Sequence, residues 1–399
     1  MKLYYKVDYI IYAYSSYFQH KLKGGNYENR LSKNLSIQRI KEKIQSNKQK
    51  RIAFFVAYHK RDKIPLSNKE YVKFLSNCSF FIFYIHNGKL NNEIINEFEN
   101  MGCYVICREN IGQDFGAWKD ITMTLNKYKL TDHVEWTLLC NDSNFYLGGD
   151  NGRDFERKFL EELNKNDQKD FISLNCNYEL KMHYQSYFLC FSKRITRTKK
   201  YIKFWKNYLP LNHRYHAIES GEKKLSQKIL NKYNPCIMFT SFDIYSKITS
   251  NIEKNSKENI VEVLPKNCFH FISCFNQNKL DNLSVQKLMH VLEVYNPSHT
   301  LALLFIVYCQ SPFLKKDIIR HGHFSSQQIQ KFVCSDEIIQ NDSLRHEIIQ
   351  HFLISGLPHS YFEKKKEAYR KGISIFGQRY DAYSDAKIYL AKYIENSEL

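Results

Sequence analysis

The chain of 399 residues lacks two features that mark exported and membrane-spanning proteins. No stretch reaches the roughly 18–20 apolar residues that a helix needs to cross a bilayer. The longest apolar run, residues 301–309, is about half that length, so we expect a core helix there. Residues 1–18 are rich in tyrosine and have neither the apolar core nor the small-residue cleavage site of a secretory signal. We therefore expect a cytoplasmic protein.

The cysteines also lack the pattern of a disulfide framework or a zinc site. There are 11 of them, an odd number, and no spacing repeats. Several lie inside apolar runs, namely Cys107, Cys140, Cys190 and Cys309. Cysteines in such runs are typical of small buried side chains in a reducing compartment. Cys103 and Cys107 are four residues apart, but no further His or Cys set completes a zinc site.

Acidic residues are scarce relative to basic ones. The chain has 59 Lys and Arg against 41 Asp and Glu, a formal net charge of +18. Such a charge favours an anionic partner, for which a nucleotide diphosphate, an anionic lipid surface and a nucleic acid are the candidates. None of the sequence signatures of nucleic-acid binding is present, so no nucleic acid is expected. A basic surface that serves only solubility stays open.

Between residues 50 and 280 the sequence alternates short apolar runs with helical patterns. The first four apolar runs are residues 52–58, 80–85, 103–107 and 134–140. An unbroken apolar run is typical of a parallel strand that is covered on both faces. Strands that alternate with helices of roughly 10–15 residues predict an α/β fold with a mostly parallel sheet. Two local signals are a capping box at Ser67 and Glu70 and a helix-ending turn at Gly102.

Two segments flank this α/β domain, and both look helical. Residues 1–49 are basic and could lie at a membrane interface or pack on the main domain. In residues 281–399 apolar residues recur at helical spacing, which predicts an all-helical C-terminal domain with a basic segment at residues 364–371. That domain could hold an acceptor lipid, a partner enzyme or the membrane surface, or it could be a structural addition.

Polar residues stand at or just after the end of each of the four apolar runs. They are Tyr58 and His59, the triplet His86, Asn87 and Gly88, the loop Asn110 to Asp114, and the triplet Asn141, Asp142 and Ser143. Parallel strands end at one edge of a sheet, and ligands bind at that edge. Four loops that share one edge predict a single site, whereas unrelated turns would be scattered.

The loop before the helix at Phe115 carries Gly112 and Gly116. Glycine allows backbone geometry or a close approach that a Cβ would block, and the helix start offers N–H groups to an anion. A tight turn with no ligand explains the same glycines. Gly-x-x-x-Gly is not by itself a phosphate fingerprint, so spacing alone does not separate the two interpretations.

Three acids have a chemical and a structural interpretation. Asp142, at the end of a buried strand, could hold a divalent ion against a diphosphate or cap the next turn. Glu219 and Glu222 open a predicted helix, where either could be a general base or could stabilise the helix start. His183 begins a predicted strand over residues 183–191 and could orient a substrate or only bond at the strand edge.

Three motifs together resemble the rhamnan synthesis protein F family. They are residues 110–119 (NIGQDFGAWK), 138–143 (LLCNDS) and 183–188 (HYQSYF), and the resemblance covers about residues 51–242. That family is similar to GT-A glycosyltransferases and is associated with building cell-surface polysaccharides. The resemblance implies a GT-A-like, Rossmann-type sheet and a nucleotide-sugar donor bound in the first half of that sheet.

The resemblance also implies roles for residues at each site. Donor binding falls to Tyr58, His86, Asn87, Gly88, Asn110, Gly112, Asp114, Gly116, Lys119, Asn141 and Asp142, catalysis to Glu222, Glu219 and His183, and acceptor or sugar binding to Gln185, Ser186 and Tyr187. Asn141 and Asp142 stand where GT-A enzymes carry Asp-x-Asp, so this chain has one carboxylate where two are usual. Asp142 is the expected ligand of Mg²⁺ or Mn²⁺, and Lys119 would offset charge on the leaving phosphate.

The expected function is transfer of a hexose such as rhamnose from a nucleotide-sugar to a cell-surface polysaccharide or lipid-linked glycan. Association with the inner face of the cell membrane is expected with it. One alternative is a silent relative that binds nucleotide-sugar without turnover, which the single carboxylate allows. Another is a protein that binds an anionic surface or a nucleic acid through its net charge.

Overall fold

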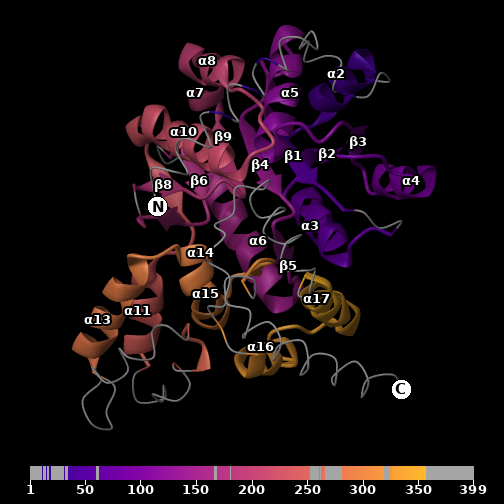
Figure 1. Cartoon of the computed structure of the whole chain (residues 1–399). Coiled ribbons are helices and arrows are strands. Elements are labelled where there is room, and N and C mark those ends of the chain that lie inside the picture. The colour runs from indigo at the N-terminus through magenta and orange to yellow at the C-terminus, as the bar shows by residue number, and fades with distance from the viewer. Residues whose placement is uncertain are drawn as a thin grey trace.

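A computed structural model shows a seven-stranded sheet with helices on both faces (Figure 1). The structure describes residues 35–59, 63–165, 169–179, 181–251, 262–265, 281–318 and 326–355, with isolated residues outside these ranges. The strands run in the order β10-β6-β9-β4-β1-β2-β3. Their bounds are β1 Arg51–Ala57, β2 Phe80–His86, β3 Tyr104–Cys107, β4 Trp136–Asn141, β6 Phe171–Ser173, β9 Phe188–Ser192 and β10 Pro235–Ile237.

The sheet is mostly parallel, as the alternation of strands and helices predicts. Strand β1 pairs in parallel with both β2 and β4, β2 pairs in parallel with β3, and β10 with β6. Only β9 runs antiparallel, between β4 and β6. The predicted α/β fold is therefore confirmed.

The helices around the sheet divide its side chains between two cores. Their bounds are α2 Ile37–Ser46, α3 Leu66–Asn77, α4 Asn92–Asn100, α5 Gln113–Lys127, α6 Gly149–Asn164, α7 Lys193–Thr196 and α8 Lys199–Asn207. Along β1, Phe55 packs in one core with α3 and α6, and its neighbours Phe54 and Val56 pack in the other with α5 and α8. Because successive side chains leave a strand on opposite faces, a strand covered twice must be apolar at every position.

The start of α3 differs from the predicted capping box. Helix α3 begins at Leu66, and the backbone N–H groups of Leu66 and Ser67 donate to the carboxylate of Glu347, from the far end of the chain. The Ser67 hydroxyl instead accepts from the backbone N–H of Tyr146 at 2.8 Å. A long-range carboxylate has taken the capping role, which local spacing cannot reveal. The predicted turn at Gly102 is confirmed, with φ at +86°.

Two elements between residues 183 and 228 have bounds that differ from the predicted ones. The single strand expected over residues 183–191 is broken into β8 (His183–Tyr184), which pairs with β7 (Cys176–Asn177), and β9. The helix expected to open at Glu219 begins earlier. Helix α9 (Arg214–His216) runs on as a π-helix η2 (Ala217–Lys223) and then as α10 (Lys224–Lys228), so Glu219 and Glu222 lie inside it rather than in its first turn.

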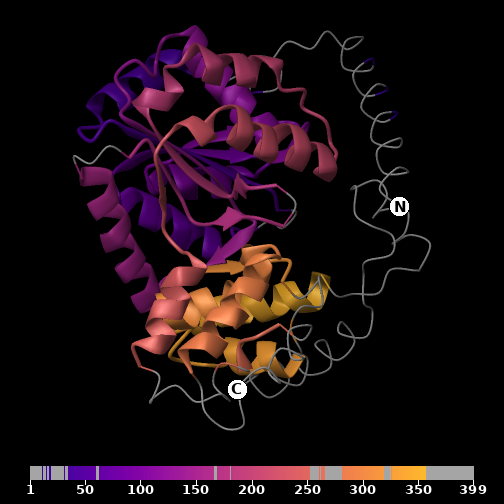
Figure 2. The same ribbon diagram turned by 90° about the vertical axis from the view of Figure 1, so that its left-hand side faces the viewer.

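The C-terminal segment is mostly helical, but the all-helical prediction is wrong. Strand β11 (Phe313–Lys315) pairs antiparallel with β5 (Asn144–Tyr146), which follows β4. The helices of this segment are α13 Asn282–Glu293, α14 Pro297–Thr300, α15 Ala302–Cys309, α16 Ser326–Val333 and α17 Asp342–Ser355, and α11 Ser241–Thr249 precedes it. Phe313 enters the same core as β1 and α3, which pulls β11 against the main sheet (Figure 2). The boundaries at residues 49 and 280 stay predictions.

The apolar run at residues 301–309 is the largely buried helix α15, as predicted. Among the described residues, no helix combines the length and apolarity that crossing a membrane requires. The nine cysteines that the structure describes are all free thiols. The predicted membrane-interface position of the first part of residues 1–49 and the basic segment at residues 364–371 fall outside the described residues, apart from isolated positions before residue 35.

Candidate active site at the strand ends

The ends of β1 and β4 meet at Asp142. The backbone N–H of Asp142 donates to Val56 at 3.0 Å, and the Asp142 carboxylate accepts from the backbone N–H of Tyr58 at 3.3 Å. The Lys316 ammonium, just beyond β11, lies 3.9 Å from the same carboxylate. Asp142 therefore has one fixed backbone donor and one cation beside it.

The end of β2 adds a buried histidine to this edge. The His86 Nε2 atom accepts from the backbone N–H of His59 at 3.2 Å. The Tyr58 ring, 47% exposed, lies stacked with its centroid 6.3 Å from that of His86. Burial lowers the pKa of His86, while bonds with the backbone of Gly88 and His59 and the charge of Asp142 oppose that shift.

The start of α5 brings a second carboxylate toward Asp142. The Asn141 side-chain amide donates to Asp114 at 2.7 Å. Burial raises the pKa of Asp114 to about 7, the charge of Asp142 adds to that rise, and Asn141 opposes it. His86, Asp114 and Asp142 thus lie within one electrostatic neighbourhood, as the parallel strands predict.

A cavity of about 880 Å³ opens at this edge. Its walls come from both halves of the chain: Tyr58, His59, Lys63, Ile64, Pro65, Asp142, Phe145, Lys316, Asp342, Ser343, His346, Glu347, Gln350 and His351. Sequence reasoning found Tyr58, His59 and Asp142 of this set. The wall residues from α17 and from the end of β11 escaped because these elements fold back over the sheet edge from about 200 residues further along the chain. Two lysines after a short apolar run, Lys315 and Lys316, are the one signal the sequence offers.

Several residues predicted to bind the donor are instead held by the protein. Arg108, buried at the end of β3, pairs with Asp120 at 3.0 Å and donates to the Asn87 side chain and to the carbonyl of Ile111. This ion pair, which sequence reasoning missed, fixes the two loops that follow β2 and β3. The Asn87 side chain is correspondingly buried and engaged.

The glycines of the loop are explained by contacts within the chain. Gly112 has φ at +77°, and a Cβ there would lie 2.4 Å from the Cβ of Pro210. Its N–H donates to Asn212 at 2.6 Å, and Asn212 in turn donates to the carbonyl of Asn110. A Cβ at Gly116 would lie 2.1 Å from the carbonyl oxygen of Ile111. The close approach predicted for these glycines exists, and the chain itself makes it.

The expectation that Lys119 would neutralise a phosphate does not fit its surroundings. The Lys119 residue is 1% exposed, and its ammonium donates to the carbonyls of Lys206, at 3.0 Å, and Tyr208. A charge buried this deeply and bonded to two carbonyls holds the end of α8 in place. Lys315 and Lys316, by contrast, contact Ser143 and Asp142 at the end of β4.

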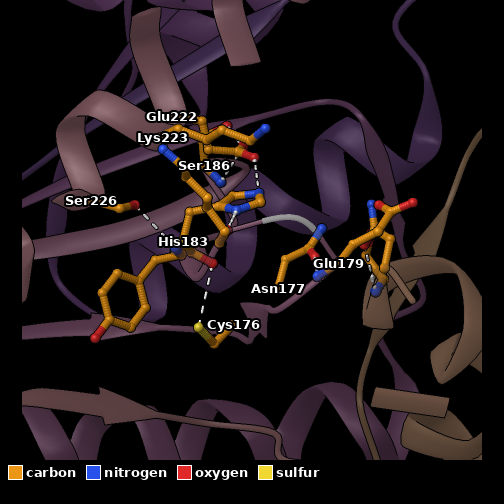
Figure 3. A network of polar contacts seen from close by, with 12 residues as sticks. Cys176, Asn177, Glu179, His183, Ser186, Glu222, Lys223 and Ser226 are labelled. Atoms are coloured by element: carbon orange, nitrogen blue, oxygen red, sulfur yellow. Dashed lines mark hydrogen bonds and ion pairs between the residues drawn. The ribbon is translucent and has the colours of Figure 1, made fainter. Parts of the chain in front are cut away.

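A second cluster gathers around Glu222 (Figure 3). The His183 Nε2 atom lies 3.0 Å from one carboxylate oxygen of Glu222. The other oxygen accepts from the Ser186 backbone N–H at 2.9 Å and from its hydroxyl at 2.5 Å. The His183 Nδ1 atom bonds the carbonyl of Lys181 at 2.6 Å, which fixes the ring.

The contact between His183 and Glu222 favours the charged form of each side chain. Burial alone would raise the pKa of Glu222, but the bonds from His183 and Ser186 outweigh it and hold that pKa below its ordinary value. Burial alone would lower the pKa of His183, but Glu222 outweighs it and the pKa is raised. Glu219, the other predicted base, pairs with Lys223 at 2.5 Å.

Lys315 connects the two clusters. Its ammonium donates to the Ser143 hydroxyl at 3.1 Å and lies 4.8 Å from the centroid of the Tyr187 ring. Burial lowers the pKa of Lys315, and the carboxylates of Asp317, Glu222 and Asp114 oppose that shift. One cation therefore feels carboxylates from both clusters, Asp114 from the first and Glu222 from the second.

Tyr187 and Gln185, the two remaining candidates for acceptor binding, differ in whether their polar atoms have hydrogen-bond partners. The Tyr187 hydroxyl donates to the Asn175 side chain at 3.0 Å. Gln185 is 6% exposed, and its amide nitrogen has no hydrogen-bond partner among the described residues. A buried amide donor without a partner is costly, so Gln185 is the better candidate for contact with a ligand.

Asp142 and Asp114 are the two carboxylates at this edge that could hold a divalent cation. Asp142 and Asp114 are near enough for the charge of Asp142 to raise the pKa of Asp114, a repulsion that a cation would relieve. Within the described part of the chain, no group of three or more His, Cys, Asp or Glu residues is placed to hold a metal. A donor diphosphate could supply the missing oxygens, so Mg²⁺ or Mn²⁺ fits as an ion that arrives with the donor.

Comparison with known proteins gives one family. No curated protein matches the chain. A family model matches from within β2 to the end of β10, a segment that carries Asp114, Asp142, His183 and Glu222. Residues 82–237 of the chain thus match rhamnan synthesis protein F, a family that implies a glycosyltransferase-related role in rhamnan synthesis.

Proposed function

We propose that the protein transfers a hexose, with rhamnose the first candidate, from a nucleotide-sugar to a cell-surface polysaccharide or a lipid-linked glycan. The observation that carries the proposal is the cavity of about 880 Å³ at the ends of the parallel strands, with Asp142, Tyr58 and Lys316 on its wall. Its volume suits a nucleotide-sized ligand. The match to rhamnan synthesis protein F supports the proposal independently.

On the donor side, each wall residue has a task that its chemistry suits. The exposed Tyr58 ring, stacked on His86, offers a face to a nucleobase. Lys316 would offset the charge that grows on the leaving diphosphate. A divalent cation held by Asp142 and Asp114 would act as a Lewis acid on the same diphosphate.

On the acceptor side, Glu222 would take the proton of the attacking hydroxyl. Its lowered pKa keeps it ionised at neutral pH, the form that a base requires. Both of its oxygens already accept hydrogen bonds, so the acceptor hydroxyl would replace that of Ser186. His183 would hold the carboxylate in place, and Gln185 would donate to the sugar.

The direct test measures release of nucleoside diphosphate from a panel of nucleotide-sugars, with and without Mg²⁺ or Mn²⁺. Asp142→Ala should lower turnover roughly 100-fold, because it removes a charged group at the diphosphate. The exposed acid Asp132 provides the matched control, since Asp132→Ala changes the same charge away from the cavity. Wild-type turnover in Asp142→Ala would contradict the assignment.

A silent relative that only binds nucleotide-sugar is the second candidate. The hydrogen bonds that already occupy both oxygens of Glu222 favour it, because they compete with an acceptor hydroxyl for the lone pairs that a base needs. In that case calorimetry would show tight donor binding to the wild type, lost in Asp142→Ala, and no sugar would reach any acceptor glycan.

A further inference from the structure

A groove lined by lysines separates α8 from η2 and α10, outside the site described above. Its volume is about 540 Å³. Its walls are Lys200, Lys203, Phe204, Asn207, Tyr208, Leu209, His216, Ser220, Lys224, Lys228 and Ile229. Figure 1 shows α8 and α10 at the upper left, away from α15, α16 and α17 at the bottom.

Both helices turn lysines toward this groove by their periodicity. Helix α8 buries Tyr201 and Trp205 in the core, which leaves Lys200 and Lys203, three residues apart, exposed on its outer side. Lys224 and Lys228 are four residues apart on α10 and are also exposed. Two facing pairs of cations thus rim the groove.

These lysines have no carboxylate to balance them. None of the described side chains that line the groove is an acid. Within the part of the chain that the structure describes, the four lysines form no ion pair, and only Lys224 makes a hydrogen bond, with Ser220 at 3.2 Å. Four unbalanced cations on one surface attract an anion.

The floor of the groove narrows the choice of anion. Phe204, Leu209 and Ile229 give it an apolar base beneath the charged rim. An amphiphile satisfies both layers, with its phosphate on the lysines and its acyl end on the floor. A nucleic acid would call for several exposed aromatic rings to stack with bases. Of the aromatic residues that line the groove, Tyr208 and His216 are buried, and Phe204 is partly exposed.

We propose that the groove between α8 and α10 binds the headgroups of anionic phospholipids and holds the protein against a membrane surface. The binding surface lies on these two helices and not on the predicted terminal segments. It leaves the cavity at Asp142 uncovered, on the side of α17. The inference does not depend on sugar transfer, and its test measures no turnover.

The test is sedimentation of the full chain with phosphatidylcholine vesicles, with and without phosphatidylglycerol. The wild type should bind only the anionic vesicles, and added salt should weaken that binding. Lys203→Glu with Lys224→Glu should lower the partition coefficient roughly 30-fold or more, since each lysine near an anionic surface contributes about a factor of 5. Lys41→Glu with Lys43→Glu, on the exposed side of α2, makes the same charge change elsewhere and should bind nearly as the wild type does.

Three results would overturn the proposal. One is equal loss in both double variants, which would assign binding to net charge alone. Another is that the variant with Lys203→Glu and Lys224→Glu still binds vesicles but no longer binds a single-stranded oligonucleotide. The third is release of the protein from vesicles when inorganic pyrophosphate is added at a concentration that saturates its binding to the protein. In that case the ligand of the groove would be a free diphosphate and not a lipid headgroup. Unchanged thermal unfolding midpoints would show that both double variants are folded.

Discussion

Lys316 shows why individual side chains of the cavity at Asp142 could not be predicted from the sequence. It stands one residue beyond β11, 3.9 Å from Asp142 and over the Phe145 ring at 5.2 Å. Lys119, the lysine within the motif, is instead bonded to carbonyls in the interior. The family resemblance assigned the phosphate-neutralising role to Lys119, whereas the tertiary contact of β11 with β5 places Lys316, not Lys119, beside Asp142.

We predict that Lys316→Gln weakens binding of a nucleoside diphosphate about tenfold or more. A charge-assisted hydrogen bond contributes roughly 1.5–3 kcal/mol, and about 1.4 kcal/mol corresponds to a factor of ten. Isothermal titration calorimetry measures the change. Lys331→Gln, on α16 and paired with Glu262, removes the same charge outside the cavity and should leave the affinity unchanged. Equal affinities for the Lys316 variant and the wild type would remove Lys316 from the donor site.

The His183–Glu222 pair predicts a pH-dependent stability. The pKa of His183 is raised above 6.5, so its contribution is complete below that pH and is lost as the pH rises through the raised value. The pKa of Glu222 is lowered below 4.5, so its contribution is lost only as the pH falls through the lowered value. Between about pH 5 and 6 the pair is fully charged.

Glu222→Gln should therefore cost about 1–3 kcal/mol of unfolding free energy near pH 5.5, and less as the pH rises above the His183 pKa. Urea unfolding at several pH values measures this difference. Ser186→Ala is the matched control, because it removes the hydroxyl bond to the same carboxylate and leaves both titrating groups. A cost of Glu222→Gln that stays constant across the pH range would contradict the ion pair.

The elements show a clear division between what the sequence predicts and what it does not. The doubly covered strands β1 and β2 and the turn at Gly102 follow from local rules, because their environment repeats along the strand or lies within one turn. The cap of α3 by Glu347 and the pairing of β11 depend on partners far along the chain. The convergence of the strand ends was predictable because parallel pairing alone imposes it.

A comparison of Gly112 with Gly102 distinguishes the cost of a left-handed backbone from the cost of a steric overlap. Both have positive φ, +77° and +86°, but a Cβ at Gly102 meets nothing within 4 Å while one at Gly112 overlaps Pro210. Gly102→Ala should cost about 1–2 kcal/mol from the left-handed backbone alone. Gly112→Ala should cost about 3 kcal/mol or more, since overlap adds to that strain. Chemical unfolding compares them, and equal costs would show that the Pro210 loop moves aside freely.

At the scale of the whole molecule, one hydrophobic core joins the sheet to the described part of the C-terminal segment. Phe313 of β11 lies with its ring centroid 5.6 Å from Tyr71, 5.1 Å from Phe155 and 5.8 Å from Phe188. Residues of α13 and α15, such as Leu288 and Leu304, belong to the same buried cluster as Phe55 of β1. A core shared in this way predicts that the C-terminal segment and the sheet unfold together, whatever boundary is drawn between them.

Phe313→Ala tests whether the sheet and the C-terminal segment unfold together. Loss of a buried phenylalanine costs about 3–5 kcal/mol, and the whole transition should move to lower denaturant. Trp118 and Trp205 lie in the opposite core, whereas Trp136, the third tryptophan, packs against the core that contains Phe313. In a Trp136→Phe background, tryptophan fluorescence therefore reports on a region that Phe313 does not touch. If the core is cooperative, tryptophan fluorescence and far-ultraviolet circular dichroism shift together, while Phe242→Ala, at a residue 70% exposed, moves neither. If fluorescence holds at the wild-type midpoint while circular dichroism shifts, the C-terminal segment unfolds as a separate domain, because its loss would leave the far face of the sheet intact.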